Sequence, residues 1–169
     1  MSRTIMRRGA EMHVAGELPQ PGDRLPPMKL TGTDLADVGL DAFAGKAKIF
    51  NIFPSLDTPT CALSMKQFNA RVEAMPGVVL LQVSADLPFA HKRFCAAEGL
   101  KNGVTLSMMR DKTFAADYGV LIEDGGMAGL CARAVIVADG NDVVVHSQLV
   151  SEISEEPDYD AAMAALESA

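Results

Sequence analysis

Short apolar runs alternate with amphipathic segments through the middle of the chain. Residues 49–53 and 78–86 are apolar runs bounded by proline or turn residues, and their length and composition predict buried strands. Each run precedes a segment whose apolar positions recur at helical spacing, from Pro59 to Met75 and from Pro88 to Gly99. The pattern therefore predicts the order strand, helix, strand, helix.

Turn-forming residues mark where these two helices begin. Thr58 and Asp86 have short polar side chains that can cap a helix, and each comes shortly before a proline suited to the first turn. We therefore expect Thr58 to cap the first helix and Asp86 to cap the second.

The remaining segments complete a mixed α/β pattern. Residues 104–108 predict a short strand, Asp111 to Tyr118 a helix, and residues 132–139 and 142–150 an antiparallel hairpin around Gly140. The apolar stripe after Pro157 predicts a last helix, and residues 3–15 resemble an N-terminal β-hairpin. This order is typical of a thioredoxin-like α/β fold, with a central mixed sheet flanked by helices. With 169 residues, we expect a single domain over 1–169.

Composition and charge narrow the range of functions. A formal charge of −7 argues against nucleic acid or an anionic membrane as a partner, because such surfaces attract clustered Lys and Arg. The apolar runs are too short to span a membrane, and the N-terminal residues lack a secretory apolar region. Three cysteines are too few and odd in number for a secreted disulfide scaffold. We therefore expect a cytoplasmic protein with reduced or catalytic thiols.

Cys61 is the main candidate for chemistry. It falls in the first turn of the helix that begins at Pro59, where unpaired amides and the helix dipole favour an anion. A thiolate held there could act as a nucleophile. The alternative is a structural cysteine packed beneath the helix, because free cysteine is often buried.

The motif around Cys61 resembles that of a known enzyme family. Pro54-x-x-x-Thr58-x-x-Cys61 matches the peroxiredoxin active-site motif, and NIFPSLDTPTC, SADLPFA and RFCAAEGL are similar to the thiol peroxidase subfamily of atypical 2-Cys type. This resemblance implies that Cys61 is the peroxidatic nucleophile, that Thr58 holds the peroxide and the thiolate, and that Pro54 limits water access. It also implies that Arg133 stabilises the thiolate and the transition state.

Arg133 is also unusual for its position within an apolar run. A charged side chain in ARAVIVA must either reach an edge of the sheet or pair with a buried anion. The Cys61 thiolate is the natural buried partner, and a surface arginine at a strand end is the alternative.

The other two cysteines differ in expected role. The resemblance implies that Cys95 is the resolving cysteine, which would form an intramolecular disulfide with Cys61. Because cysteines on two separate helices rarely lie close enough for a disulfide, we expect local unwinding around both. The alternative for Cys95 is core packing beside Phe94. Cys131 has no counterpart in the subfamily pattern. Strand alternation would place it on the same face as Arg133, so a minor redox role is the alternative, and we expect it to pack in the core.

The expected function is a thioredoxin-dependent peroxidase. The resemblance implies reduction of hydrogen peroxide and of alkyl or lipid hydroperoxides, recycling by thioredoxin, and a homodimer. Leu63, Phe89, Leu130 and the methionines could line an apolar approach or belong to the core. The three histidines lack metal-ligand spacing, so we expect no metal and no other cofactor. Alternatives are a dithiol-disulfide oxidoreductase, which would normally contain a C-x-x-C pair, and a peroxide sensor that does not turn over.

Overall fold

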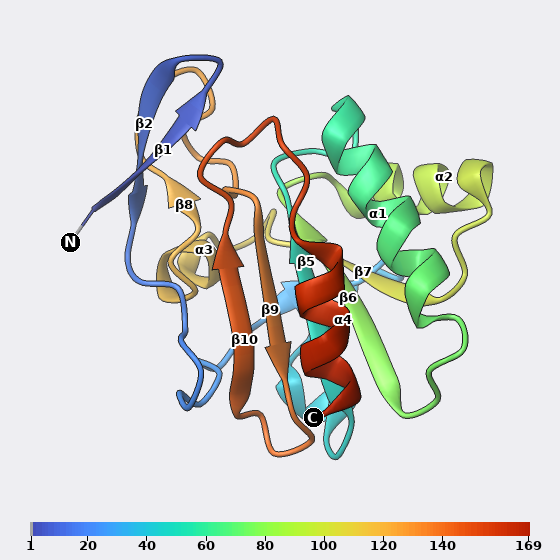
Figure 1. Cartoon of the computed structure of the whole chain (residues 1–169). Coiled ribbons are helices and arrows are strands. Elements are labelled where there is room, and N and C mark those ends of the chain that lie inside the picture. The colour runs from blue at the N-terminus through green and yellow to red at the C-terminus, as the bar shows by residue number, and fades with distance from the viewer. Residues whose placement is uncertain (1) are drawn as a thin grey trace.

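A seven-stranded mixed sheet forms the centre of the molecule in this computed structural model, which describes residues 2–169 (Figure 1). The strand order is β10-β9-β5-β6-β7-β3-β4. The strands β5, β6 and β7 are parallel, whereas β9, β10, β3 and β4 pair antiparallel with their neighbours. The bounds are β3 Leu30–Thr31, β4 Asp37–Val38, β5 Ala47–Ile52, β6 Val78–Ser84, β7 Gly103–Ser107, β9 Ala134–Ala138 and β10 Val144–Leu149.

Helices cover both faces of this sheet. The α1 and α4 helices pack on one face, and Phe94 of α2 packs beside Met65 of α1 in a cluster at the end of that layer. The short α3 helix packs into the core on the opposite face. The bounds are α1 Pro59–Val72, α2 Pro88–Glu98, α3 Thr113–Asp117 and α4 Tyr159–Glu167, with a single 3₁₀ turn η1 at Leu40–Phe43.

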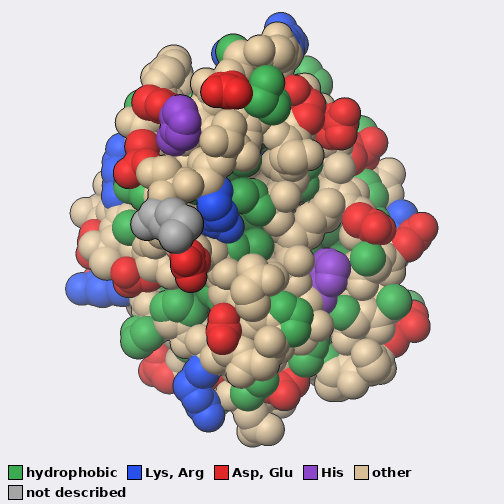
Figure 2. All heavy atoms as spheres, turned by 60° about the vertical axis from the view of Figure 1, so that its left-hand side comes forward, with side chains coloured by type: hydrophobic (Ala, Val, Ile, Leu, Met, Phe, Trp, Pro, Cys, Tyr) green, Lys and Arg blue, Asp and Glu red, His purple; other side chains and the backbone are tan. Residues whose placement is uncertain are grey.

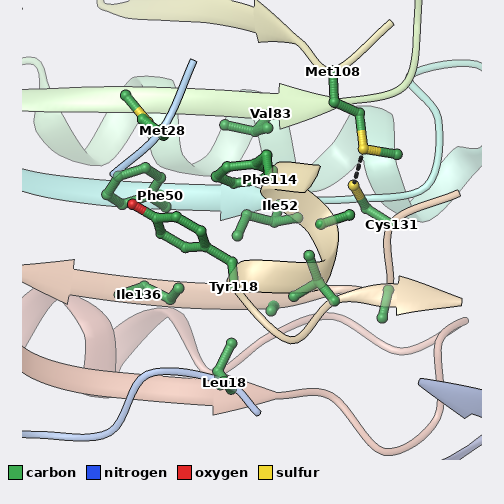
Figure 3. Packing of buried hydrophobic residues seen from close by; sticks show 14 of the residues in the cluster. Leu18, Met28, Phe50, Ile52, Val83, Met108, Phe114, Tyr118, Cys131 and Ile136 are labelled. Atoms are coloured by element: carbon green, nitrogen blue, oxygen red, sulfur yellow. Dashed lines mark hydrogen bonds between the residues drawn. The ribbon is translucent and has the colours of Figure 1, made fainter. Parts of the chain in front are cut away.

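Strand alternation separates the two cores. Ile49 of β5 belongs to the cluster under α1 and α4, whereas Phe50 and Ile52 point to the other face, where they meet Phe114 and Tyr118 (Figure 3). Successive strand residues point to opposite faces, so a fully buried strand needs apolar residues at nearly every position. This explains why the central strands are mostly apolar, with Lys48, Asn51 and Gln82 among the exceptions.

A polar row crosses the face of the sheet beneath α1. Asn51 and Gln82 are register partners on β5 and β6, and Asn51 Nδ2 donates to Gln82 Oε1 at 2.8 Å and to Ser64 Oγ at 3.1 Å. Ser64 Oγ donates to the carbonyl oxygen of Cys61 at 2.9 Å, and Gln82 Nε2 donates to that of Met65 at 3.1 Å. These buried polar groups connect the first turns of α1 to the sheet.

The N-terminal residues form the predicted hairpin. The strands β1 Arg3–Arg7 and β2 Ala10–Ala15 pair antiparallel, and β2 also pairs with β8 Leu121–Ile122 in a second, three-stranded sheet. Arg8 and Gly9 form the turn with φ of 50° and 86°, a left-handed region that favours glycine at the second position. The hairpin is fastened to the segment before α4, since Met6 N donates to Ser151 O at 2.7 Å and Ile153 N donates to Met6 O at 2.9 Å.

Most of the predicted elements are confirmed, with corrections at helix starts and short strands. The thioredoxin-like α/β fold, both hairpins and the four helices are present. Asp86 does not cap α2: Leu87 occupies the N-cap, and the Asp86 carboxylate binds the loop before α1 instead. Thr58 occupies the N-cap of α1, but its side chain makes no capping hydrogen bond. The sequence pattern did not predict the two-residue strands β3, β4 and β8.

Candidate active site

The start of α1 holds Cys61 in a buried position. Pro59 and Thr60 open the helix and Cys61 follows in the first turn, with its side chain fully buried. Within the described chain, the Thr58 side chain makes no capping hydrogen bond to α1. Its Oγ1 donates instead to Ser55 O at 3.1 Å. The amides of the first helical turn and the helix dipole favour negative charge at the sulfur.

Arg133 reaches the Cys61 sulfur from the segment immediately before β9. Its Nη2 lies 3.3 Å from Cys61 Sγ, and its Nε donates to Ile153 O at 2.9 Å. Arg133 is only 2% exposed, so it is not a surface arginine at a strand end. The Nη1 atom is buried without a hydrogen-bond partner within the described residues and is available to a bound oxygen. The attraction between a buried guanidinium and an anion beside it is stronger than at an exposed surface, because the surroundings are less polar.

A cavity of about 370 Å³ lies above this pair. It combines residues of the loop before α1, the hairpin turn, the loop after β8 and the segment before α4. The lining residues are Arg7, Arg8, Pro54, Asp57, Thr58, Pro59, Thr60, Met127, Arg133, Ile153 and Ser154. The cavity therefore brings together Pro54, Thr58 and Arg133, with Cys61 buried next to Arg133.

The predicted apolar approach is mostly wrong. Within residues 2–169, Met127 is the only methionine that lines the cavity, and neither Leu63, Phe89 nor Leu130 does. Leu63 and Phe89 are instead exposed on α1 and α2. Sequence analysis also missed Arg7 and Arg8, because nothing in the local pattern of a hairpin turn shows that it folds over a distant helix.

Cys95 lies on α2, packed against the same apolar cluster as Cys61. It is half-buried and lines a different hollow of about 550 Å³, together with Phe43, Leu100 and Val104. Burial raises the pKa of the Cys95 thiol, so less of it is thiolate while α2 stays folded. All three cysteines are free thiols in this structure.

Cys131 belongs to the core on the opposite face of the sheet. It is fully buried, and its Sγ lies 3.5 Å from Met108 Sδ (Figure 3). Burial raises the pKa of its thiol to about 12, which suppresses the thiolate. The expected core packing is confirmed, but Cys131 precedes β9 and makes only one isolated bridge, so strand alternation does not apply to it.

Asp86 links the loop before α1 to the start of α2. Its carboxylate accepts hydrogen bonds from Ser55 Oγ and Leu56 N, both at 2.8 Å, and from Ser84 Oγ at 2.6 Å. Ser84 Oγ also lies 2.8 Å from Nε2 of the buried His91 on α2. Because the Ser84 hydroxyl donates to Asp86, His91 Nε2 donates to Ser84. One carboxylate therefore holds the segments that carry Cys61 and Cys95 together.

We expect His91 to make folding stability depend on pH. Burial lowers its pKa from 6.5 to about 4, although the nearby Asp86 charge partly opposes this. Unfolding therefore takes up a proton between these values, so the stability contributed by neutral His91 is complete above pH 6.5 and falls towards pH 4. The full loss amounts to about 3 kcal/mol, at about 1.4 kcal/mol per pH unit.

Urea unfolding of the wild type and of His91→Gln between pH 7.5 and 4.5 measures this contribution. The wild type should lose more unfolding free energy than the variant as the pH falls. Because Asp86 and the other carboxylates are common to both proteins, the difference isolates His91. Equal losses in the two proteins would show that His91 does not carry the effect.

Comparison with known proteins places the chain in a family. The Redoxin family profile matches residues 20–163. Thiol peroxidases of Mycobacterium bovis and Mycobacterium tuberculosis are each 52% identical over 164 residues, covering 96% of this chain and 97% of the relative.

Solved structures agree with these relatives. A peroxiredoxin-like protein from Aquifex aeolicus superposes with a TM-score of 0.92 at 36% identity, covering 99% of this chain and 98% of that one. A thiol peroxidase from Chromobacterium violaceum gives a TM-score of 0.91 at 26% identity, covering 98% and 95%.

By its fold and its cysteine at a helix start, the protein is of the thioredoxin-like thiol-redox class. It belongs to the Redoxin family, and within that family to the thiol peroxidases, enzymes that reduce hydroperoxides with a cysteine thiol. Within residues 2–169, no helix is long and apolar enough to cross a bilayer.

Proposed function

We propose that Cys61 is the peroxidatic cysteine of this thiol peroxidase. The observation that carries the proposal is the 3.3 Å contact between Arg133 Nη2 and Cys61 Sγ, in a buried site at the start of α1. The low polarity of the surroundings strengthens this interaction, and it favours the form of sulfur that attacks peroxides.

The reaction follows from these groups. The Cys61 thiolate attacks one oxygen of the hydroperoxide, so an S–O bond forms while the O–O bond breaks. Sulfur is oxidised to a sulfenic acid, and the peroxide is reduced to an alkoxide or hydroxide, which takes a proton to leave as an alcohol or water. Arg133 Nη1, which has no partner within the described residues, is the donor we assign to the departing oxygen.

Thr58 and Pro54 shape the approach to the sulfur. Both line the cavity, and we propose that the Thr58 hydroxyl turns from Ser55 O to the bound peroxide while Pro54 limits access of water. The single 3.1 Å bond to Ser55 O is the contact that the hydroxyl would exchange for the peroxide.

We propose that Cys95 resolves the sulfenic acid. Its thiolate would attack the Cys61 sulfur, forming the disulfide and releasing the sulfenic oxygen as water. Cys95 lies on another helix and opens to another hollow, which supports our view that both segments unwind first. Unwinding would also remove the burial that raises the pKa of Cys95.

Recycling, assembly and location complete the proposal. We propose thioredoxin as the reductant of the disulfide, a cytoplasmic location, one functional domain over 1–169, and a homodimer. Leu87 and Phe89, which are 54% and 63% exposed at the start of α2, are apolar surface that a dimer could bury. Light scattering during size-exclusion chromatography, with Phe89→Ser as the variant, tests the dimer.

Oxidation with one equivalent of hydrogen peroxide tests the central proposal. Peptide mapping by mass spectrometry should find a disulfide between Cys61 and Cys95 within a single chain, with Cys131 still reduced. A bridge that includes Cys131, or oxidation without Cys61, would contradict it.

A further inference from the structure

Two arginines of the hairpin turn lie at the cavity and have no role in the reaction described above. Arg7 and Arg8 line the cavity together with Arg133, and both are exposed. Within residues 2–169, neither side chain forms a hydrogen bond or an ion pair that meets ordinary distance criteria. These two cations are therefore available to a ligand in the cavity.

The backbone holds this turn firmly in place. Arg8 adopts a φ of 50°, which is uncommon for a residue other than glycine, and its amide donates to the Glu152 carboxylate at 3.1 Å. The hairpin and the segment after β10 are joined by backbone bonds at Met6, and the same segment supplies the Ile153 carbonyl that binds Arg133. The segment after β10 thus fixes the position of the hairpin turn relative to Arg133.

The local charge differs from that of the whole molecule. The chain carries a net charge of −7, and the face in Figure 2 shows acidic side chains spread widely and basic ones well separated. The cavity, in contrast, is lined by three arginines and a single carboxylate, Asp57, which lies 3.6 Å from Arg93.

Glu152 lies close to the turn and offsets part of its charge. Hydrogen bonds from Ser154 and, to a smaller extent, Arg8 lower the pKa of Glu152, so it is ionised at neutral pH. Its two oxygens already accept from the Arg8 amide and from Ser154. Within the described part of the chain, Arg7 forms no ion pair with a carboxylate, so positive charge remains at the cavity.

We propose that Arg7 and Arg8 form a carboxylate-binding subsite that selects organic hydroperoxides bearing an acidic group. The inference rests on the proposed reaction at Cys61 and adds a class of substrate to it. The peroxide group would meet Cys61 and Arg133, the carbon body would pack on Pro54, Met127 and Ile153, and the carboxylate would bind the guanidinium groups at the turn.

A matched pair of substrates tests the proposal. Cumene hydroperoxide with a para carboxylate and its methyl ester have the same peroxide and differ in charge. The full-length wild type should show kcat/KM about fivefold higher for the acid, since exposed charge pairs contribute up to about 1 kcal/mol each. The preference should shrink between 0.02 M and 0.5 M salt, because salt screens exposed charges.

Charge variants distinguish an effect of Arg7 and Arg8 from a general effect of the net charge of the protein. The acid preference, taken as the ratio of kcat/KM for the acid to kcat/KM for the ester, should disappear in R7Q/R8Q and reverse in R7E/R8E. It should persist in K46Q/K101Q, which removes two exposed charges that do not line the cavity. Equal wild-type rates for acid and ester, or a preference that survives in R7Q/R8Q, would overturn the proposal.

A second readout does not require peroxide turnover. Iodoacetate and iodoacetamide differ in charge and both alkylate thiolates, so their rate ratio at Cys61, measured by mass spectrometry, reports the local preference for an anion. The ratio should fall about fivefold in R7Q/R8Q and stay unchanged in K46Q/K101Q. If hydrogen peroxide were not reduced at all, the proposed reaction would fail while this ratio would still decide on the subsite.

Discussion

Replacing Cys61 by serine should lower peroxide turnover by at least about a thousandfold, the largest effect of any change considered. A serine hydroxyl is not ionised at neutral pH, so it cannot attack the peroxide even beside Arg133. The measurement is NADPH oxidation coupled through thioredoxin reductase and thioredoxin, with hydrogen peroxide and with an alkyl hydroperoxide. Turnover of both substrates should be lost, because the same sulfur reduces both.

Two further cysteine variants make this result specific. Cys95→Ser should retain one turnover per chain and then stop, since thioredoxin has no disulfide to reduce. Cys131→Ala should keep repeated turnover, because Cys131 packs against Met108 on the other face of the sheet. Sustained turnover by Cys61→Ser would refute the assignment, and sustained turnover by Cys95→Ser would refute the resolving role.

Replacing Arg133 by methionine should lower kcat/KM by about a hundredfold to a thousandfold. Methionine fills much of the same buried space but removes both the donor to Cys61 Sγ and the donor proposed for the departing oxygen. A hydrogen bond to a charged group contributes about 1.5–3 kcal/mol, and loss of one donor to a developing oxyanion costs a similar amount or more. Both donors act in the attack of Cys61 on the peroxide, so the loss of each lowers the same rate.

The rate of alkylation distinguishes this role from a purely structural one. Alkylation of Cys61 by iodoacetamide at neutral pH should be slower in Arg133→Met than in the wild type, with Arg133→Lys intermediate. Lysine keeps the charge but cannot donate to both Ile153 O and Cys61 Sγ in the same way. Thermal unfolding is the control for folding. An unchanged alkylation rate in a folded variant would show that Arg133 does not stabilise the thiolate.

Local sequence pattern was sufficient for much of the fold, and the family resemblance added the residues at the centre of the site. The apolar runs at β5 and β6 are buried on both faces and therefore stand out clearly. Pro59 marks the start of α1 and so places Cys61 in its first turn. The local pattern at Arg133 left an edge position and a buried partner open, and the family resemblance favoured the buried partner. The structure places its Nη2 atom 3.3 Å from Cys61 Sγ.

Features that depend on distant contacts could not be predicted in this way. Asp86 looks like a helix cap in the sequence, but its carboxylate binds Ser55 and Leu56, about thirty positions earlier. Lys48 is fully buried in β5 because Asp142, in the turn before β10, lies 2.6 Å away. Neither partner can be found from periodicity, since tertiary contacts bring these segments together.

In the proposed cycle the start of α1 unwinds and refolds, and the polar row beneath it then has a further consequence. A purely apolar sheet surface would allow the refolded helix to pack at several positions along it with little difference in free energy. Ser64, Asn51 and Gln82 match one another in only one alignment, and any slip would leave buried amides without partners. In the proposed cycle, the sheet would therefore act as a template that returns the Cys61 sulfur to the same position after each round.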